Sequence, residues 1–301
     1  MKDYQTKYQW AVSLAVYMPE TIIRKLLENV RQYFAGAAIV YILGLNRIIA
    51  LVMLKKERQA FILHNVNLHN KVLVGDLSTG INVSEDTIRR DLQELAEHGK
   101  LIKVHGGALS KSFYTSFKPA QVYSLENKKR IAQKAAGLIQ DGMFVSTTGG
   151  TTIIELAKAL PENLHATFIT GSLPAALEYI HHPNIEVIMI GDKLSKSSQI
   201  TVGGEAITRI RQIRADICFL GTNALDANQG LTDNDWDVVQ VKRAMIESSS
   251  RVVSLAIAEK LNTVQRIRVC ETKDIDVLIT ELEPDSPELI PYKNNGIKTL
   301  L

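Results

Sequence analysis

Residues 83–92 read Val-Ser-Glu-Asp-Thr-Ile-Arg-Arg-Asp-Leu, and this stretch decides the fold of the N-terminal part of the chain. Ser84 is a preferred N-cap, because its hydroxyl can accept a hydrogen bond from an unpaired N–H of the first helical turn. Glu85 and Asp86 add negative charge where the helix dipole favours it. Gly99 is a natural residue to follow a helix C-terminus. The stretch therefore predicts a helix that begins after Ser84 and ends near Gly99.

This helix is expected to be amphipathic. At 100° per residue, one face carries Ile88, Leu92 and Leu95, and the opposite face carries Asp86, Arg90, Gln93 and Glu97, with Thr87 and Arg89 on the flanks. If this helix enters the major groove of DNA, Arg90 is expected to read bases, because an arginine fork matches the major-groove edge of guanine. Arg89, on the flank, is expected to contact a phosphate. The acidic residues Asp91, Glu94 and Glu97 lie further along, so only the first turns are expected to approach DNA.

The flanking sequence completes a DNA-binding pattern. An apolar helical face at Leu54, Phe61, Ile62, Leu63 and Val66 precedes a short extended piece at Val72 and Val74, a short helix at 75–79 and a turn at 80–83. Residues 101–109 then read as strand, glycine turn and strand. Between Lys100 and Lys118 stand four lysines and one histidine without an acid, as expected of phosphate contacts. By themselves these residues also allow an ordinary charged surface helix followed by a hairpin.

Residues 53–109 resemble the N-terminal winged helix-turn-helix of the DeoR family of bacterial transcriptional regulators. The resemblance lies in the run 83–92 and in Val104-His105-Gly106-Gly107-Ala108, which match the family's pattern almost letter for letter. It implies that the chain binds double-stranded operator DNA and that such proteins begin near Met53. The expected DNA-binding residues are Ser84, Asp86, Thr87, Arg89, Arg90, Lys103, His105 and Gly106.

The first 52 residues form an extension whose origin the sequence leaves open. Residues 35–54 are a nearly continuous apolar run, close to the roughly 20 residues of a membrane-spanning helix. Asn46 and Arg47 interrupt it, and a central arginine costs about 2.5–3.5 kcal/mol on insertion. The run can be a membrane anchor, an additional packing helix, or non-native sequence ahead of the true start. We favour the last, because a charged helix begins directly after Met53.

Residues 110–126 lack periodicity and read as a linker, and residues 127–301 are expected to form a larger α/β domain. A helix is predicted over 126–139. Short apolar runs then alternate with helical stretches, and the predicted strands are 143–147, 167–170, 186–190, 216–220, 252–257 and 275–280. Strands that alternate with helices indicate a mainly parallel sheet.

Three of these strands end in loops of glycine and hydroxyl residues. The loops are Thr148-Gly149-Gly150-Thr151-Thr152, Thr170-Gly171-Ser172 and Gly221-Thr222-Asn223, and Gly203-Gly204 is a further site of close approach. Glycines let backbone N–H groups point at an anion, and the helix after the first loop adds positive potential. Lys242 and Lys260 can each bind a phosphate as a point charge. These features predict a pocket for a hydroxylated, phosphorylated molecule.

From about residue 128 to 280 the chain resembles the C-terminal sensor domain of the DeoR family, which is related to ribose-5-phosphate-isomerase-like enzymes. Gly150-Thr151-Thr152 fits the phosphate loop, 215–221 the central strand, and Gly230-Leu231-Thr232 with Lys242 and Lys260 continues the match. The resemblance implies a repressor of sugar-utilisation genes that a phosphorylated sugar releases from DNA. The expected effector-binding residues are Thr148, Gly150, Thr151, Thr152, Thr170, Gly203, Gly221, Thr222, Asn223, Lys242 and Lys260.

The chain departs from the family pattern at positions that contact sugar hydroxyls. Thr148-Gly149 stands where Asp often precedes the Gly-Thr-Thr loop, Gly171 where Asn commonly follows the threonine, and Glu259 where Ser precedes the lysine. These changes leave the identity of the sugar open, and they affect the phosphate site less.

The rival function is a sugar-phosphate isomerase with an attached DNA-binding domain. Isomerisation needs a carboxylate base within reach of the carbon acid. In the related enzymes acids follow the central strand, where this chain retains only Asp226, and Asp233-Asn234 offers no matching glutamate. Asn223 can hydrogen-bond a hydroxyl but cannot take a proton. We therefore expect no enzymatic activity, and the three converging loops argue against a ligand-free architectural DNA-binding protein.

Composition agrees with a globular regulator. Lys and Arg total 35 against 32 Asp and Glu, a net charge of +3, and hydrophobic residues make up 46%, which excludes a disordered or collagen-like chain. Cys218 sits in an apolar run and is expected to be a buried thiol, and two scattered cysteines fit a cytoplasmic protein. The adjacent pair His181-His182 diverges, so no metal is expected, and no cofactor is. Operators with two half-sites call for a dimer, and the family resemblance implies that tetramers are common.

Overall fold

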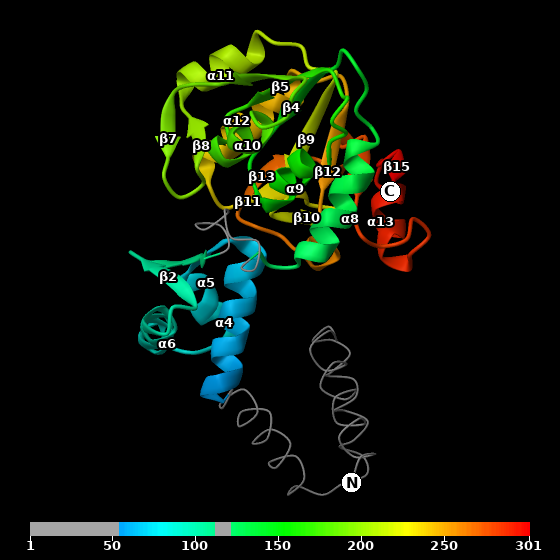
Figure 1. Cartoon of the computed structure of the whole chain (residues 1–301). Coiled ribbons are helices and arrows are strands. Elements are labelled where there is room, and N and C mark those ends of the chain that lie inside the picture. The colour runs from blue at the N-terminus through cyan, green and yellow to red at the C-terminus, as the bar shows by residue number, and fades with distance from the viewer. Residues whose placement is uncertain (1–53, 112–121) are drawn as a thin grey trace, which may run out of the picture. The chain divides into compact units, whose positions relative to one another are not determined.

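The computed structural model of the chain describes residues 54–111 and 122–301 (Figure 1). The expected N-terminal extension lies outside these residues, and so does most of the expected linker, so the domain boundaries at 53, 109 and 126 stay predictions. None of the helices in the described part of the chain is long and apolar enough to cross a membrane.

The N-terminal domain is a winged helix-turn-helix. Its elements are α4 (Lys55–His69), β1 (Lys71–Leu73), α5 (Val74–Ile81), α6 (Glu85–Glu97), β2 (Leu101–Val104) and β3 (Gly107–Ser110). The three strands form an antiparallel sheet in the order β1-β3-β2. Its core contains Ile62 and Val66 of α4, Leu77 of α5, and Ile88 and Leu92 of α6. The predicted apolar face of the helix after Ser84 is confirmed.

The turn before α6 differs in detail from the prediction. Val74 begins α5 and does not extend the strand, and α5 continues to Ile81, so the turn shrinks to Asn82 and Val83. Asn82 adopts a left-handed conformation with φ 51°, which Asn tolerates better than most residues. Ser78 ties the turn to the helix, because its carbonyl accepts from the Val83 N–H at 3.1 Å and its hydroxyl donates to the Val83 carbonyl at 2.7 Å.

The C-terminal domain is built on a seven-stranded parallel sheet in the order β15-β14-β12-β9-β4-β5-β6. The strands are β4 (Phe144–Thr147), β5 (Ala166–Thr170), β6 (Ile185–Met189), β9 (Ile217–Gly221), β12 (Val252–Leu255), β14 (Val277–Ile279) and β15 (Thr299–Leu300). All six predicted strands are confirmed. The inner strands read as apolar runs because both of their faces are covered, whereas β6, at the edge of the sheet, stays partly exposed. The order runs outward in opposite directions from β4 and β9, and such a switch point is where open α/β sheets bind ligands.

Helices cover both faces of this sheet. They are α8 (Leu125–Ala136), α9 (Thr151–Ala159), α10 (Leu173–Tyr179), α11 (Gly204–Arg211), α12 (Trp236–Glu247) and α13 (Ile290–Asn294). Strand β9 serves both cores, since successive side chains alternate between the faces. Cys218 and Leu220 pack into the core with α11 and α12, whereas Ile217 and Phe219 pack into the core with α8 and α9.

Two small antiparallel sheets were not predicted from the sequence. Strands β7 (Lys193–Ser195) and β8 (Ile200–Val202) form a hairpin, and β10 (Ala224–Asp226), β11 (Gly230–Asp233) and β13 (Ile267–Cys270) form a sheet in that order. These strands have only three or four residues, and several of the residues are polar, so they carry no long apolar run.

Both cysteines are free and buried. Burial raises the pKa of the Cys218 thiol, and that of Cys270, to about 12. The expectation that Cys218 is a buried thiol in a strand is confirmed.

Candidate nucleic-acid interface and effector pocket

Helix α6 is capped as the sequence predicts. The Ser84 Oγ accepts a hydrogen bond from the Thr87 N–H at 3.3 Å, and the two hydroxyls lie 2.9 Å apart. Ser84 is exposed and Thr87 is half-buried. These bonds fix the first turn of α6, so the N–H groups and side chains of that turn keep a defined orientation.

The two adjacent arginines of α6 differ in their surroundings. Arg89 forms ion pairs on its own helix, with Glu85 at 2.5 Å and with Asp86 at 2.8 Å. Arg90 is exposed and has no hydrogen bond or ion pair within the described part of the chain. Arg90 is therefore free to reach a base edge. Arg89 and Asp86 must first break their ion pair within the helix before they can contact DNA.

The wing carries the remaining predicted DNA contacts. The Lys103 ammonium donates to the Gln93 side chain at 2.7 Å, which links strand β2 to the outer face of α6. His105 and Gly106 are exposed at the tip of the wing, where Gly106 adopts a φ of +75°. Asp91 is 2% exposed and faces the core of the domain, so this acid does not lie on the outer face of the helix.

In the C-terminal domain, the loop after β4 forms an open helix N-terminus. Gly150 is the N-cap of α9 with a φ of +115°, a conformation that favours glycine, and it offers no side-chain cap. The first N–H groups of the helix, which include those of Thr151 and Thr152, have no intrahelical carbonyl to bind. A Cβ on Gly221 would lie 2.4 Å from the Gly149 carbonyl oxygen, so the end of β9 approaches this loop closely. This geometry suits a phosphate.

Three of the predicted effector residues make bonds within the protein and do not line the pocket at this loop. The Thr148 hydroxyl accepts from the Gly221 N–H at 2.7 Å and so joins the end of β4 to β9. The Thr170 hydroxyl donates to the Thr147 carbonyl at 2.9 Å. Gly203 is the N-cap of α11, and the carboxylate of Asp192 accepts from the first N–H groups of that helix at 3.0 and 3.1 Å.

The other eight predicted effector residues line one pocket together. They are Gly150, Thr151, Thr152, Gly221, Thr222, Asn223, Lys242 and Lys260. The sequence reasoning missed further C-terminal-domain residues of the lining, namely Ser197, Ser198, Ile200, Asp233, Asn234, Asp235 and Val238. Except for Val238, which lies in the first turn of α12, they lie in or directly after the short strands β7, β8 and β11, which carry no sequence signal of their own.

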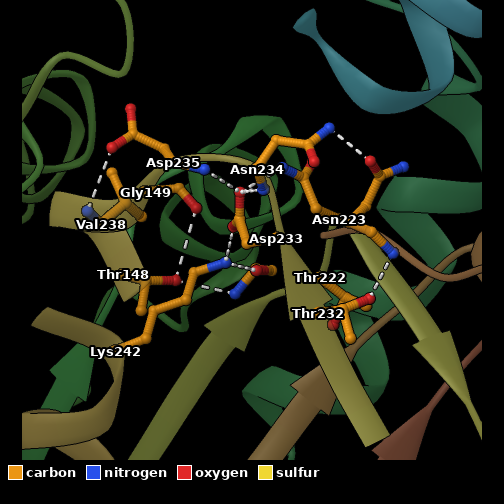
Figure 2. A network of polar contacts seen from close by, with 12 residues as sticks. Thr148, Gly149, Thr222, Asn223, Thr232, Asp233, Asn234, Asp235, Val238 and Lys242 are labelled. Atoms are coloured by element: carbon orange, nitrogen blue, oxygen red, sulfur yellow. Dashed lines mark hydrogen bonds and ion pairs between the residues drawn. The ribbon is translucent and has the colours of Figure 1, made fainter. Parts of the chain in front are cut away.

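A buried ion pair lies at the pocket wall (Figure 2). The Lys242 ammonium donates to the Asp233 carboxylate at 2.7 Å and to the Gly221 carbonyl at 2.9 Å. The other Asp233 oxygen accepts from the Asn223 side chain at 2.9 Å and from the Asn234 N–H at 2.7 Å. Burial alone would raise the pKa of Asp233, but the Lys242 charge and these hydrogen bonds hold it below its usual range.

Lys260 contributes a second buried ammonium. Its Nζ donates to the Thr222 carbonyl at 2.5 Å, and no carboxylate in the described part of the chain forms an ion pair with it. Burial, and then the nearby charges of Lys128 and Lys242, lower the pKa of Lys260 to about 7. Lys128, which the sequence reasoning did not single out, donates to the Tyr123 carbonyl at 2.6 Å, and burial lowers its pKa to about 8. Lys260 is therefore a buried amine at the pocket wall without a carboxylate partner among the described residues, whereas the Lys242 charge is balanced by Asp233.

The acids near the pocket are poorly placed for general-base catalysis. Asp233 is ion-paired with Lys242, which lowers its pKa and makes it a weaker base, and Asp235 caps helix α12 by accepting from the Val238 N–H at 3.3 Å. Asp226 accepts from the N–H groups of Asn228 and Gln229 at 2.9 Å and so stabilises the turn between β10 and β11. Within residues 54–111 and 122–301, no group of His, Cys, Asp and Glu side chains could hold a metal ion.

The family models that match this chain divide it into the same two domains. The DeoR-like helix-turn-helix domain matches residues 58–113, and the DeoR C terminal sensor domain matches residues 124–282. The HTH-type transcriptional regulator GolR of Listeria innocua is 33% identical over 75% of this chain and 90% of its own length. The glycerol-3-phosphate regulon repressor of Haemophilus influenzae is 35% identical over 70% of this chain and 83% of its own length.

A solved ribose-5-phosphate isomerase in complex with phospho-erythronic acid is 20% identical, covering 45% of this chain and 53% of that one at a TM-score of 0.34. That likeness is too distant to bear on the ligand. The two matched domains and the identity to full-length regulators are decisive: this chain belongs to the DeoR family of DNA-binding transcriptional regulators.

Proposed function

We propose that the protein is a repressor of carbohydrate-utilisation genes that a phosphorylated sugar releases from its operator. The observation that carries this proposal is the pocket in which an uncapped helix N-terminus meets two buried lysines, Lys242 and Lys260. A phosphate dianion binds the free N–H groups of the loop and supplies the counter-ion that Lys260 lacks. Several relatives, among them the glycerol-3-phosphate regulon repressor, carry the name of repressor.

The proposed DNA contacts are those of the first turns of α6 and the wing. Arg90 reads a base edge, and Ser84, Asp86, Thr87, Arg89, Lys103, His105 and Gly106 position the domain on the backbone or adjoining bases. Operators with two half-sites require two such domains. We therefore propose a homo-oligomer, a dimer or a tetramer, that works in the cytoplasm.

We propose that the effector acts through linkage. If the phosphorylated sugar binds more tightly to an arrangement that cannot engage DNA, it moves the population off the operator. In this scheme the pocket holds its ligand without converting it. Of the two acids in its wall among the described residues, Asp233 is ion-paired with Lys242, and Asp235 caps helix α12.

A fluorescence-anisotropy titration tests this proposal. The protein is titrated against DNA from its own upstream region at a stated salt concentration, with and without a panel of hexose, pentose and glycerol phosphates. The expected result is tight binding that one phosphorylated compound weakens. Thr151→Val, which removes a donor of the phosphate loop, should bind DNA normally and lose the response to that compound. Tight binding that no member of the panel changes would refute the effector mechanism.

An isomerase assay on the same preparation examines the rival function. The proposal expects no interconversion of ribose 5-phosphate and ribulose 5-phosphate above the buffer control. Turnover that Asp233→Asn abolishes would overturn the assignment as a sensor.

A further inference from the structure

The β7–β8 hairpin places a polar turn at the pocket. The proposed phosphate site does not use this turn. Strands Lys193–Ser195 and Ile200–Val202 pair in antiparallel register, and residues 196–199 form the turn between them. Ser197 and Ser198 of this turn line the same pocket as the Gly-Thr-Thr loop and the two lysines. The turn reads Lys-Ser-Ser-Gln, so it offers several hydrogen-bonding side chains and no carboxylate.

Backbone hydrogen bonds hold the hairpin against the loop after β5, next to the phosphate loop. The Thr201 N–H donates to the Gly171 carbonyl at 2.8 Å, and the Leu173 N–H donates to the Gln199 carbonyl at 3.0 Å. Ser172 pairs with Ile200 as an isolated bridge. A Cβ on Gly149 would lie 3.2 Å from the Ser172 hydroxyl, so the loop after β5 that holds the hairpin also contacts the phosphate loop.

The conformation of the turn is defined by its own bonds. The Gln199 N–H donates to the Ser195 carbonyl at 2.8 Å, and Gln199 adopts a left-handed φ of +53°. The hydroxyls of Ser195 and Ser197 lie 3.2 Å apart and bond to each other. A turn held in this way keeps its backbone in place before a ligand arrives.

One hydroxyl of the turn has no partner. The Ser198 Oγ is buried and forms no hydrogen bond within the described residues. A buried hydroxyl without a partner is uncommon in native proteins and costs free energy, so each case calls for an explanation. Because no bond holds this hydroxyl and Ser198 lines the pocket, a rotation of its side chain would let a ligand hydroxyl satisfy it. The backbone N–H groups and lysines on the other elements already account for the phosphate.

We propose that the β7–β8 turn is the part of the pocket that selects the sugar, and that the Ser198 hydroxyl binds a hydroxyl group of the effector. This inference rests on the proposed function, in which a phosphorylated sugar occupies the pocket. It assigns the phosphate to the Gly149–Thr152 loop with the lysines, and the hydroxylated carbon chain to the hairpin turn.

The test compares Ser198→Ala with Ser195→Ala by isothermal titration calorimetry on the full chain. The control variant removes a hydroxyl from the same hairpin that is bonded within the turn and does not line the pocket. The probes are inorganic phosphate, glycerol 3-phosphate, ribose 5-phosphate, glucose 6-phosphate and fructose 6-phosphate. Melting temperatures without ligand are recorded for each variant.

Ser198→Ala is expected to weaken the tightest-binding sugar phosphate about 3- to 10-fold, the usual effect of losing one neutral hydrogen bond, and to leave inorganic phosphate unchanged. Its melting temperature without ligand should equal or exceed that of the wild type, because the lost hydroxyl had no partner. Ser195→Ala should bind all probes like the wild type.

Three outcomes would overturn the inference, and they differ from a failure of the proposed function. The first is unchanged sugar-phosphate binding in Ser198→Ala, and the second is an equal loss for inorganic phosphate. The third is a wild type that binds inorganic phosphate as tightly as every sugar phosphate, in which case the phosphate site stands and the sugar-selecting turn does not. A wild type that binds no probe refutes the proposed effector class itself, and the inference with it.

Discussion

Arg89 and Arg90 are neighbours on helix α6, but in the part of the chain that the structure describes only one of the two side chains is already held in an ion pair. Arg89 is paired with Glu85 and Asp86, whereas Arg90 has no partner in the described residues. We predict that Arg90→Ala weakens operator binding by about 1–3 kcal/mol, roughly 5- to 150-fold, since it removes a base contact. Anisotropy titrations against operator and scrambled DNA measure this loss. An equal loss on both DNAs would show that Arg90 contacts only the backbone.

The buried Lys242–Asp233 pair illustrates the cost of an uncompensated charge. Their side chains are 6% and 5% exposed. Lys242→Met leaves the Asp233 carboxylate buried without its counter-ion, which typically costs about 3–5 kcal/mol. We predict that Lys242→Met and Asp233→Asn each lower the free energy of unfolding, and that the double variant is more stable than the sum of the two losses implies. Urea denaturation of the four proteins decides this; strict additivity would mean that the pair does not interact.

Lys260 makes stability depend on pH in a defined direction. Its pKa is about 7 in the folded protein, against 10.5 for an ordinary lysine in water. The unfolded chain therefore binds more protons between pH 7 and 10.5, so the free energy of unfolding rises with pH across that window, by at most about 1.4 kcal/mol per unit. Below pH 7 the penalty of the buried charge is fully present.

We predict that the wild type gains stability relative to Lys260→Met as the pH rises from about 7 to about 9. Denaturant titrations of both proteins at several pH values provide the difference, which cancels the titration of groups common to both. A difference that does not change with pH would show that Lys260 is protonated throughout this range.

At the scale of the element, the wing depends on Gly107, because the neighbouring backbone leaves no room for a side chain at that position. A Cβ on Gly107 would lie 2.0 Å from the Val72 carbonyl oxygen across the β1–β3 pair, whereas one on Gly106 meets nothing within 4 Å. Gly107→Ala must therefore separate the strands, and Gly106→Ala has only the cost of its left-handed φ, about 1 kcal/mol. We predict that Gly107→Ala has the lower melting temperature and the weaker operator binding. The reverse order would mean that the β1–β3 pair does not hold the wing.

Elements differ in how clearly the sequence indicates them. Five of the six predicted parallel strands are buried apolar runs, because helices cover both of their faces, and the sixth, β6, is a partly exposed edge strand. Helix α6 is indicated by its cap and its period. Strands β7, β8, β10, β11 and β13 have three or four residues and pair only where the fold brings them together. For this reason the pocket residues Ser198 and Asp233, which lie after and within such strands, were missed.

At the scale of the whole molecule, the proposed function couples two binding events. If a sugar phosphate lowers the affinity for the operator by some factor, the operator must lower the affinity for the sugar phosphate by the same factor. We predict a factor of about 5 to 150, the usual range for allosteric coupling. Calorimetric titration of the effector, with and without saturating operator DNA, measures it. An effector affinity that the operator leaves unchanged would exclude this coupling.

The sequence by itself determined what local chemistry specifies. The cap at Ser84, the amphipathic helix after it, the glycine turn of the wing, the parallel strands and the Gly-Thr-Thr loop all depend on residues close together in the chain. The family resemblance carried by those motifs predicted the same two domains that the comparisons find.

Only the tertiary structure decided which of the predicted effector residues share a pocket. Thr148, Thr170 and Gly203 have the residue types of the site, but their polar or backbone groups serve strand pairing and helix packing. Conversely, Asp233 pairs with Lys242 across nine positions of sequence, and Ser198 reaches the pocket on a hairpin without an apolar pattern. Hydrogen bonding and burial depend on positions in space, and sequence spacing does not encode them once the chain has folded back on itself.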